Sequence, residues 1–285
     1  IISEHKVKVL FTAPTAIRAI KREDPRGELI RKYDLSHMKY LFIVGERLDP
    51  DTYYWVSDLL KKPVIDHWWQ TETGWPVASN CMGLEPFPIK AGSSTKPVPG
   101  YQVEILNNEG EVLPPETEGI VAIKLPLPPG SLTTLWKNDS KFKESYLDIF
   151  PGYYFTGDGG YFDKDGYLYI MGRVDDVINV AGYRLSTGRM EEVVAKHPDV
   201  AECAVIGCAA GFPMGFVVLK SDVIRDPNMI IKELLQIVRD QIGTFASFKQ
   251  AVIVRCLPKT RSGKILRGTL RKIVDGKKYS IPSTI

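Results

Sequence analysis

The sequence predicts an α/β protein in which an α/β region and a β-rich region precede a small α+β domain. Apolar runs alternate with amphipathic stretches over residues 6–90, whereas Pro and Gly punctuate short alternating runs over 91–172. Mixed strand and helix patterns return from about Val174. The expected divisions are a partial α/β region at 1–90, a β-rich, barrel-like region at 91–174 and a C-terminal domain at 175–285.

Strands and helices alternate in the first 90 residues, which favours parallel strands joined by helices. The run VKVLFTA at 7–13 reads as a buried strand, and a helix over Asp51–Leu60 follows the turn-forming pair Asp49-Pro50. The other expected elements are a helix beginning at Thr15–Lys21 and strands at 39–45 and 63–69.

The later elements follow from turn signals and apolar spacing. The β-rich region has alternating runs at 101–106, 119–126, 152–158 and 166–172, with a hairpin turn at Asp163–Gly166. The C-terminal region has expected strands at 176–182, 201–207, 216–220 and 250–257, and expected helices at 187–196, at 229–242 and after Lys264.

Composition is that of an ordinary globular protein, with 44% hydrophobic and 25% charged residues. A net charge of +3 does not favour a nucleic-acid partner, and no apolar run is long enough to span a membrane. Four cysteines without a CxxC pair predict no zinc site and a reducing compartment, with the cytoplasm or the mitochondrial matrix most plausible. The opening Ile1–Glu4 resembles a cut inside a longer protein; the sequence does not give the oligomeric state.

A polar segment, DHWWQTETG at 66–74, follows the expected strand at 63–69. The carboxyl ends of such strands bind ligands, and Glu72 has the side chain that Mg²⁺ takes together with phosphate oxygens. Thr71 could donate a hydrogen bond to a phosphate. The alternative is a turn with a capping threonine and a solvated glutamate, although two adjacent tryptophans at a strand end favour a filled site.

A second segment, at 152–184, places Asp158 after Thr156-Gly157 near a strand end. A carboxylate there could accept both hydroxyls of a ribose, and the guanidinium groups of Arg173 and Arg184 could bind an anion. Surface salt bridges from these arginines to nearby aspartates are the alternative reading.

A third segment, LPKTRSGKILR at 257–267, carries Lys264 near the end of a Pro, Ser and Gly loop that we expect to be mobile. A lysine ammonium suits charge that develops on a reacting phosphate or carboxylate. An exposed basic loop, or a basic tail that contacts nucleic acid, is the alternative.

The three segments in this order resemble the adenylate-forming superfamily of acyl-CoA synthetases, luciferases and peptide-synthetase adenylation domains. The pair Trp68-Trp69 resembles the acetyl- and propionyl-CoA synthetase branch, and the runs at 11–20, 180–184 and 279–285 resemble its propionate-type members. The resemblance covers essentially the whole chain. It implies the remainder of a large AMP-binding N-terminal domain followed by a mobile C-terminal domain.

The resemblance implies a short-chain acyl-CoA synthetase of the propionate–CoA ligase type. Its substrates would be a short carboxylate, ATP and CoA, with Mg²⁺, and no nucleic acid would take part. The carboxylate would attack the α-phosphate to give an acyl-adenylate and pyrophosphate, and CoA would then form the thioester and release AMP. An acetate–CoA ligase, and a non-catalytic fragment that binds nucleotide or CoA weakly, remain alternatives.

The family roles transfer to matching positions of this sequence. Those implied to contact the nucleotide are Gly45, Glu46, Arg47, Asp66, His67, Trp68, Trp69, Gln70, Thr71, Asp158, Arg173 and Arg184. Glu72 would hold Mg²⁺, Trp69 would close the acyl pocket and Lys264 would serve the adenylation step. Asp175 would be the hinge, with Ala181, Gly182 and Arg239 meeting CoA. A further cation is implied at the carbonyls near Ala195, His197 and Val200.

Two departures from the family pattern limit what this chain is expected to do. No stretch resembles the family's Ser/Thr/Gly-rich loop ending in Lys, which cradles pyrophosphate. We therefore expect the 285 residues alone not to form an acyl-adenylate from ATP. The segment 207–216 also looks shortened, which would affect how CoA docks.

Overall fold

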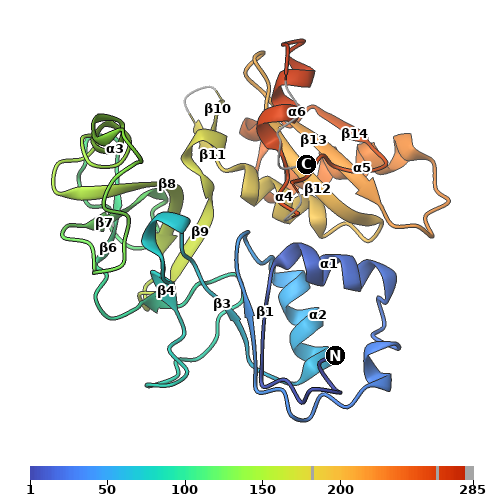
Figure 1. Cartoon of the computed structure of the whole chain (residues 1–285). Coiled ribbons are helices and arrows are strands. Elements are labelled where there is room, and N and C mark those ends of the chain that lie inside the picture. Colours follow the sequence, from blue (N-terminus) through green and yellow to red (C-terminus); the bar gives the residue numbers. More distant parts are fainter. Residues whose placement is uncertain (181–182, 261–262, 280–285) are drawn as a thin grey trace. The chain divides into compact units, whose positions relative to one another are not determined.

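The computed structural model describes residues 1–180, 183–260 and 263–279, and the chain forms two compact units. One unit comprises residues 1–14 and 27–174, and the other comprises 15–26 and 175–285. Figure 1 labels the helices and strands along the chain. The division of the first unit near residue 90 stays a prediction.

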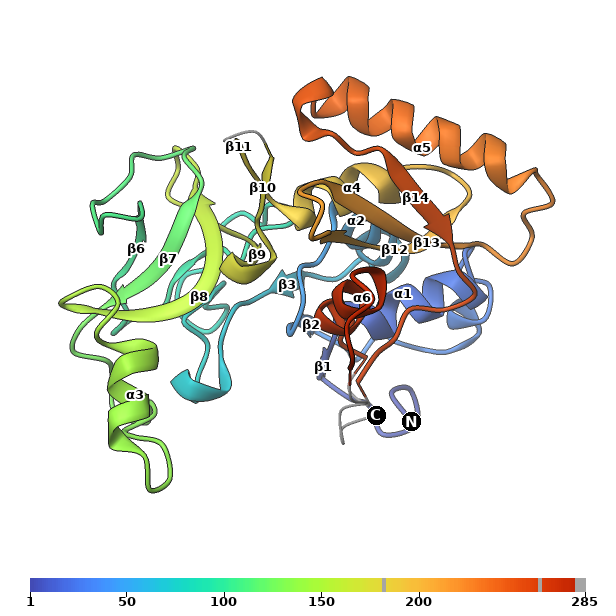
Figure 2. The same cartoon turned by 90° about the horizontal axis from the view of Figure 1, so that it is seen from above.

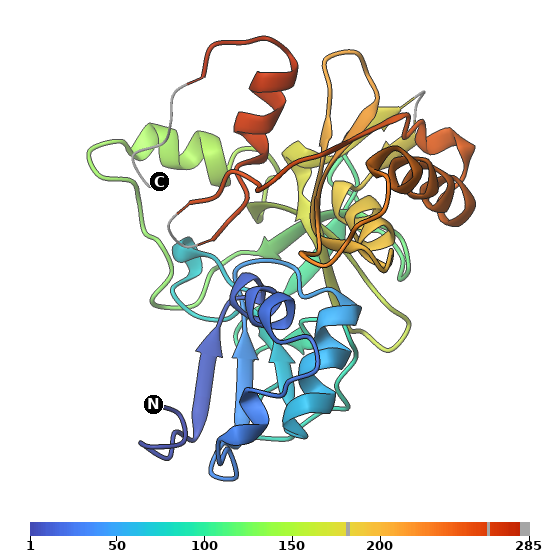
Figure 3. The same cartoon turned by 90° about the vertical axis from the view of Figure 1, so that its right-hand side faces the viewer.

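The first unit contains a three-stranded parallel sheet in the order β1-β2-β3 (Figure 3). Its strands are β1 (Val9–Thr12), β2 (Tyr40–Ile43) and β3 (Val64–Asp66). Helix α2 (Pro50–Leu60) joins β2 to β3, with Pro50 at its first position and the Asp49 carboxylate accepting from the Thr52 amide. The predicted parallel strands are confirmed, and they bring the ends of β2 and β3 to one edge.

The prediction of a buried first strand is wrong. Val9 and Phe11 of β1 are 47% and 57% exposed. β1 lies at an edge of the described sheet, with β2 as its one partner there, so its apolar run does not mean burial on both faces. Helix α1 (Pro14–Glu23) follows β1.

The β-rich part is an open antiparallel sheet in the order β6-β7-β8-β9 and not a barrel, which corrects the barrel-like expectation. Its strands are β6 (Val103–Leu106), β7 (Gly119–Lys124), β8 (Tyr153–Phe162) and β9 (Leu168–Arg173). The Asp163 carboxylate accepts from the amides of Asp165 and Tyr167, which fixes the predicted hairpin turn between β8 and β9. The short strands β4 (Ala78–Ser79) and β5 (Lys96–Pro97) form a separate pair.

A shift in strand pairing and an additional helix in this part both matter for the site. The pairing of β7 with β8 shifts, because Ala122 lies opposite Phe155 whereas Val121 lies opposite Asp158. Helix α3 (Asp139–Tyr146) was not predicted from the sequence; Asn138 caps it through a hydrogen bond from the Lys141 amide.

The second unit has the predicted α+β composition around a sheet in the order β12-β13-β14. These strands are β12 (Val200–Gly207), β13 (Pro213–Leu219) and β14 (Gln250–Ile253); β13 pairs antiparallel with β12 and parallel with β14. Helices α4 (Thr187–Ala195) and α5 (Pro227–Gln241) pack in one apolar cluster, and α6 (Arg267–Val274) packs in another (Figure 2). Strands β10 (Ile178–Val180) and β11 (Tyr183–Leu185) pair antiparallel.

Short 3₁₀ helices complete the fold at Ile30–Lys32, Thr71–Thr73, Val174–Asp176 and Thr244–Ala246. Within the described part of the chain, no helix is both long enough and apolar enough to cross a membrane.

Candidate functional site

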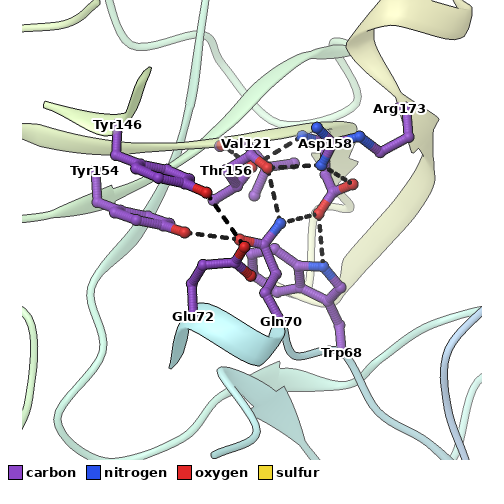
Figure 4. Close-up of polar contacts among 9 residues, drawn as sticks. All are labelled: Trp68, Gln70, Glu72, Val121, Tyr146, Tyr154, Thr156, Asp158 and Arg173. Atoms are coloured by element: carbon purple, nitrogen blue, oxygen red, sulfur yellow. Dashed lines mark hydrogen bonds and ion pairs between the residues drawn. The ribbon is translucent and has the colours of Figure 1, made fainter. Parts of the chain in front are cut away.

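Asp158 is the centre of a polar network in the first unit (Figure 4). Its Oδ2 accepts hydrogen bonds from Trp68 Nε1 at 3.0 Å and from Gln70 Nε2 at 2.7 Å. Its Oδ1 lies 3.4 Å from Arg173 Nη1. Because Asp158 and Arg173 are paired in neighbouring strands β8 and β9, the sheet register itself brings the carboxylate to the guanidinium.

The irregular backbone of β8 positions both charged groups. The Thr156 carbonyl accepts from Gln70 Nε2 at 2.7 Å and from Arg173 Nη1 at 2.8 Å. Gly157 has φ = 69°, and a Cβ added there would lie 2.3 Å from Arg173 Nη2. Glycine therefore suits the left-handed backbone, and its lack of a Cβ leaves room for the guanidinium in the observed position.

Burial is the largest influence on the protonation of Asp158. Burial raises the pKa of the Asp158 carboxyl, while Arg173 and the hydrogen bonds from Trp68 and Gln70 act in the opposite direction. Neighbouring donors thus offset part of the cost of burying the ionised carboxylate. A ligand that brings hydroxyl donors to this carboxylate would favour the same ionised form.

Glu72 lies on the 3₁₀ helix that follows β3, and two tyrosines connect it to Asp158. Tyr146 donates to Glu72 Oε1 at 3.2 Å, and its ring stacks on that of Tyr154 at 5.3 Å between centroids. Tyr154 in turn donates to Gln70 Oε1 at 3.1 Å. The predicted residues Trp68, Gln70, Glu72, Asp158 and Arg173 therefore belong to one connected set of contacts.

A magnesium ion bound with nucleotide phosphates needs only one or two carboxylates from the protein. Glu72 keeps Oε1 on Tyr146, and none of the residues that the structure describes donates to Oε2. One carboxylate oxygen thus remains for a cation, and the site fits this role. Among the described residues, no group of three or more His, Cys, Asp and Glu side chains forms a metal cluster of its own.

Two buried titratable residues lie side by side at the end of β3. Burial raises the pKa of Asp66 to about 7, against the opposing effects of a hydrogen bond from the Leu48 backbone and of the Arg47 charge. Burial lowers the pKa of His67 to about 4, and its ring meets those of Phe11 and Phe42 edge-on. Gly45–Arg47 follows β2, so this segment shares the sheet edge with Asp66.

Comparison with known proteins identifies the family. Residues 1–128 match the model of the AMP-binding enzyme family, and residues 189–264 match that of the AMP-binding enzyme C-terminal domain. The chain belongs to this family of adenylate-forming enzymes. The prediction made from the three sequence segments is thereby confirmed.

Curated relatives match the whole chain or nearly so. An uncharacterised protein of Pseudomonas aeruginosa is 54% identical over 100% of this chain and 46% of its own length. The mitochondrial acyl-CoA synthetase short-chain family member 3 of Mus musculus is 49% identical over 100% of this chain and 42% of its length. The propionate–CoA ligase of Escherichia coli is 42% identical over 97% of this chain and 45% of its length. The chain thus spans less than half the length of these relatives.

Solved structures share the fold. An anthranilate CoA ligase in complex with anthranoyl-AMP is 29% identical with a TM-score of 0.83, covering 96% of this chain and 51% of that one. A benzoate CoA ligase of Burkholderia xenovorans is 26% identical with a TM-score of 0.81, covering 95% and 52%. These matches confirm the predicted fold class.

Other predicted residues of the first unit differ in exposure. Trp68 is 7% exposed and packs with Val77 and Tyr154, whereas its neighbour Trp69 is 37% exposed. Of these two adjacent rings, only Trp68 belongs to the core. Thr71 and Gly45 are exposed, and Glu46 is half-buried.

In the second unit, Lys264 is exposed at the end of a small turn. Lys259 and Ile265 form an isolated antiparallel bridge, and the Thr260 amide donates to the Lys264 carbonyl at 2.9 Å. The backbone on both sides of residues 261 and 262 is therefore paired. Those two residues themselves lie outside the described part of the chain.

Arg239 of α5 lines a hollow of about 550 Å³, together with two lysines and the turn that follows the helix. The other lining residues are Lys232, Leu235, Gln236, Val238, Gly243, Thr244, Ala246, Ser247, Phe248 and Lys249. This cationic lining suits an anion such as a phosphate. Ala181, Gly182 and the Arg184 side chain, also predicted as ligand contacts, lie outside the described residues.

The remaining predictions in this unit are neither supported nor contradicted. Asp175 is in the 3₁₀ helix Val174–Asp176, where the second unit begins. The Asp175 carbonyl accepts from Arg271 Nη2 at 3.4 Å. The His197 carbonyl accepts from the Val200 amide at 3.1 Å, and His197 Nε2 lies 2.8 Å from Glu233 Oε2. Ala195 is the last residue of α4. The hinge and the carbonyl-bound cation stay predictions.

Sequence reasoning missed the residues that connect the site. No role was assigned to Tyr146, Tyr154, Thr156 and Gly157, although Tyr154 and Thr156 precede Asp158 by four and two positions on β8. Alternate residues of a strand share a face, so this spacing could have marked them. Tyr146 had no such signal, because α3 itself was not predicted.

Proposed function

We propose that this chain supplies the nucleotide-binding and C-terminal parts of a short-chain acyl-CoA synthetase of the propionate–CoA ligase type. The reaction joins a short carboxylate to AMP at the expense of ATP and then transfers the acyl group to CoA. The observation that carries the proposal is the connected set Glu72, Gln70, Asp158 and Arg173. In this set hydrogen bonds and a stacked pair of tyrosines connect an anion-pairing group with two carboxylates.

Each residue has a proposed role that follows from its chemistry. The Asp158 carboxylate accepts from ribose hydroxyls, and the Arg173 guanidinium beside it adds positive charge. Glu72 holds the magnesium ion, which neutralises phosphate charge when bound. Lys264 brings an ammonium to the charge that develops at the α-phosphate, and the hollow lined by Arg239 receives part of CoA. Positioning and charge, rather than a nucleophilic side chain, drive such chemistry.

We propose a short acid as substrate because of Trp69. A bulky indole that closes the acyl pocket leaves room for few carbons, and each methylene changes binding by about 1–3 kcal/mol. Propionate is preferred over acetate in this proposal because the relatives include a propionate–CoA ligase. In Trp69→Gly, a longer-chain acyl-sulfamoyl-adenosine should bind as well as or better than the propionyl compound; unchanged chain-length dependence would contradict the assignment.

Binding of a non-hydrolysable intermediate tests the proposal directly. Calorimetry with propionyl-sulfamoyl-adenosine should show saturable one-to-one binding to the purified chain, weakened about tenfold or more in Arg173→Ala, since hydrogen bonds to charged groups contribute about 1.5–3 kcal/mol. Arg225→Ala is the matched control, because it removes a guanidinium that pairs with Asp199 at 2.7 Å in the second unit. Absence of binding to the unaltered chain would overturn the proposal.

Adenylation itself is a separate matter. The 285 residues contain no Ser/Thr/Gly-rich loop ending in Lys, so we expect the chain alone to bind the intermediate analogue without catalysing propionate-dependent ATP–pyrophosphate exchange. Robust exchange would show that other residues replace this loop.

A further inference from the structure

We propose that Tyr146 and Tyr154 are positioning residues that hold the two ends of the nucleotide site separately. Tyr146 orients Glu72 at the phosphate end, and Tyr154 orients Gln70, and through it Asp158, at the ribose end. This inference rests on the proposed function and concerns two residues to which the sequence analysis assigned no role.

The two rings form one rigid unit from two elements. Tyr146 ends α3 and Tyr154 lies in β8, and their rings are stacked with an angle of 4° between planes (Figure 4). Tyr154 is fully buried, so its ring cannot move without opening the core. The two hydroxyls point to different partners, Glu72 and Gln70.

The Tyr154 hydroxyl supports the orientation of the Gln70 amide by donating to its oxygen. Its donation to Oε1 leaves Nε2 to donate to Asp158 Oδ2 and to the Thr156 carbonyl. A reversed amide would set its oxygen against the Asp158 carboxylate, where two acceptors repel each other. Loss of this hydroxyl therefore loosens Asp158 while leaving the ring stack in place.

The Tyr146 hydroxyl acts in the same manner on Glu72. It occupies Oε1, which restricts rotation of the half-buried carboxylate and leaves Oε2 for a cation. Burial raises the pKa of both phenols, so both remain protonated donors at neutral pH. Without the Tyr146 hydroxyl, cation binding would have to order the Glu72 side chain, at a cost in conformational entropy.

Two single-hydroxyl variants of the chain separate these roles. Tyr146→Phe and Tyr154→Phe each keep the stack and remove one donor. Calorimetry is performed with AMP in the absence of metal, and with ATP in the presence and absence of Mg²⁺. The two quantities compared are the affinity for AMP and the gain in ATP affinity that Mg²⁺ confers. For hydrogen bonds of this kind we expect each variant to change one of them by about fivefold or more and the other by less than about twofold.

Tyr146→Phe should lower the gain in ATP affinity that Mg²⁺ confers while AMP binds normally. Tyr154→Phe should weaken AMP binding while the gain from Mg²⁺ persists. Tyr101→Phe is the control, because it removes a hydroxyl that donates to the Thr73 carbonyl at 3.1 Å on the same 3₁₀ helix; both ligand readouts should stay unchanged.

The outcomes distinguish this inference from the proposed function. If the unaltered chain binds neither AMP nor propionyl-sulfamoyl-adenosine, the proposed function fails. A different outcome is that the unaltered chain binds them while each variant loses both AMP affinity and the Mg²⁺-dependent gain in ATP affinity, or loses neither. In either case the division of roles is wrong. The same holds if Mg²⁺ gives the unaltered chain no gain in ATP affinity.

Discussion

The polar residues of the first unit and those of the second unit are held to very different degrees. Asp158 accepts from Trp68 and Gln70 and lies beside Arg173, all in fixed positions of sheet and core. Among the described residues, by contrast, Lys264 has no hydrogen bond to its ammonium group and stands exposed. The nucleotide end of the proposed site is therefore preorganised, whereas the lysine that we propose for the adenylation step would have to be ordered at the time of reaction.

The largest expected effect tests the preorganised end. Asp158→Asn keeps the shape of the side chain but removes its charge, and should weaken propionyl-sulfamoyl-adenosine binding by about 3 kcal/mol, because two charge-assisted hydrogen bonds are lost. Asp165→Asn, at the exposed tip of the same hairpin, is the control in calorimetry. Equal affinities of the two variants would remove Asp158 from the site.

The next effect separates backbone strain from the position of Arg173. Gly157→Ala and Gly166→Ala both force alanine into a left-handed conformation, at φ = 69° and 76°, and each should lower unfolding stability by about 1–2 kcal/mol. Only at Gly157 would the new Cβ meet a side chain, that of Arg173; Gly166 has open space around it.

Analogue affinity should therefore fall about tenfold in Gly157→Ala and stay unchanged in Gly166→Ala, as the Arg173 hydrogen bond to the Thr156 carbonyl is displaced. Equal affinity in both variants would mean that Arg173 tolerates displacement. Urea unfolding can follow the first unit alone, because all five tryptophans lie in it.

A further effect concerns pH and the pair at the end of β3. The pKa of Asp66 is raised to about 7. Its contribution to the free energy of unfolding is therefore greatest at low pH and is lost as pH rises through that value. The lowered pKa of His67, about 4, acts in the opposite sense, since its stabilisation is present above the unfolded pKa and lost as pH falls towards 4. The two contributions cancel between about pH 4 and 6.5.

Single substitutions should reveal the opposed slopes, each of about 1.4 kcal/mol per pH unit at most. Asp66→Asn should make the first unit lose stability as pH falls through this window, and His67→Gln should make it gain stability. Tryptophan-monitored urea unfolding at several pH values measures both. Parallel pH profiles of the two variants would contradict the opposed titrations.

The smallest effect tests the other side of the comparison. Lys264→Ala should change the affinity for propionyl-sulfamoyl-adenosine by less than about threefold, because an exposed ammonium gains little beyond the cost of ordering its side chain. A loss as large as that of Arg173→Ala would show that the lysine is already in place when the analogue binds.

Sequence reasoning reached the family, the fold class and the charged residues, because each depends on local signals. The carboxylate at 158 and the guanidinium at 173 have glycine beside them, which residue types and spacing can show. The expected strand end at Asp158 is wrong, because β8 continues to Phe162, whereas Arg173 does end β9. The exposure of β1 could not be predicted, since an apolar run does not tell an edge strand from a central one. Helix α3 was missed because its stretch carries mostly polar residues and only Phe142 is buried.

The shifted pairing of β8 has a consequence for the length of this strand. Two residues, Thr156 and Gly157, lie between the pairs Phe155–Ala122 and Asp158–Val121. An even number of extra residues preserves the alternation of the two faces, so Tyr154 and Asp158 both reach Gln70. Loss or gain of a single residue here would turn one of them to the opposite face, and homologous proteins should tolerate length changes in this strand only in steps of two.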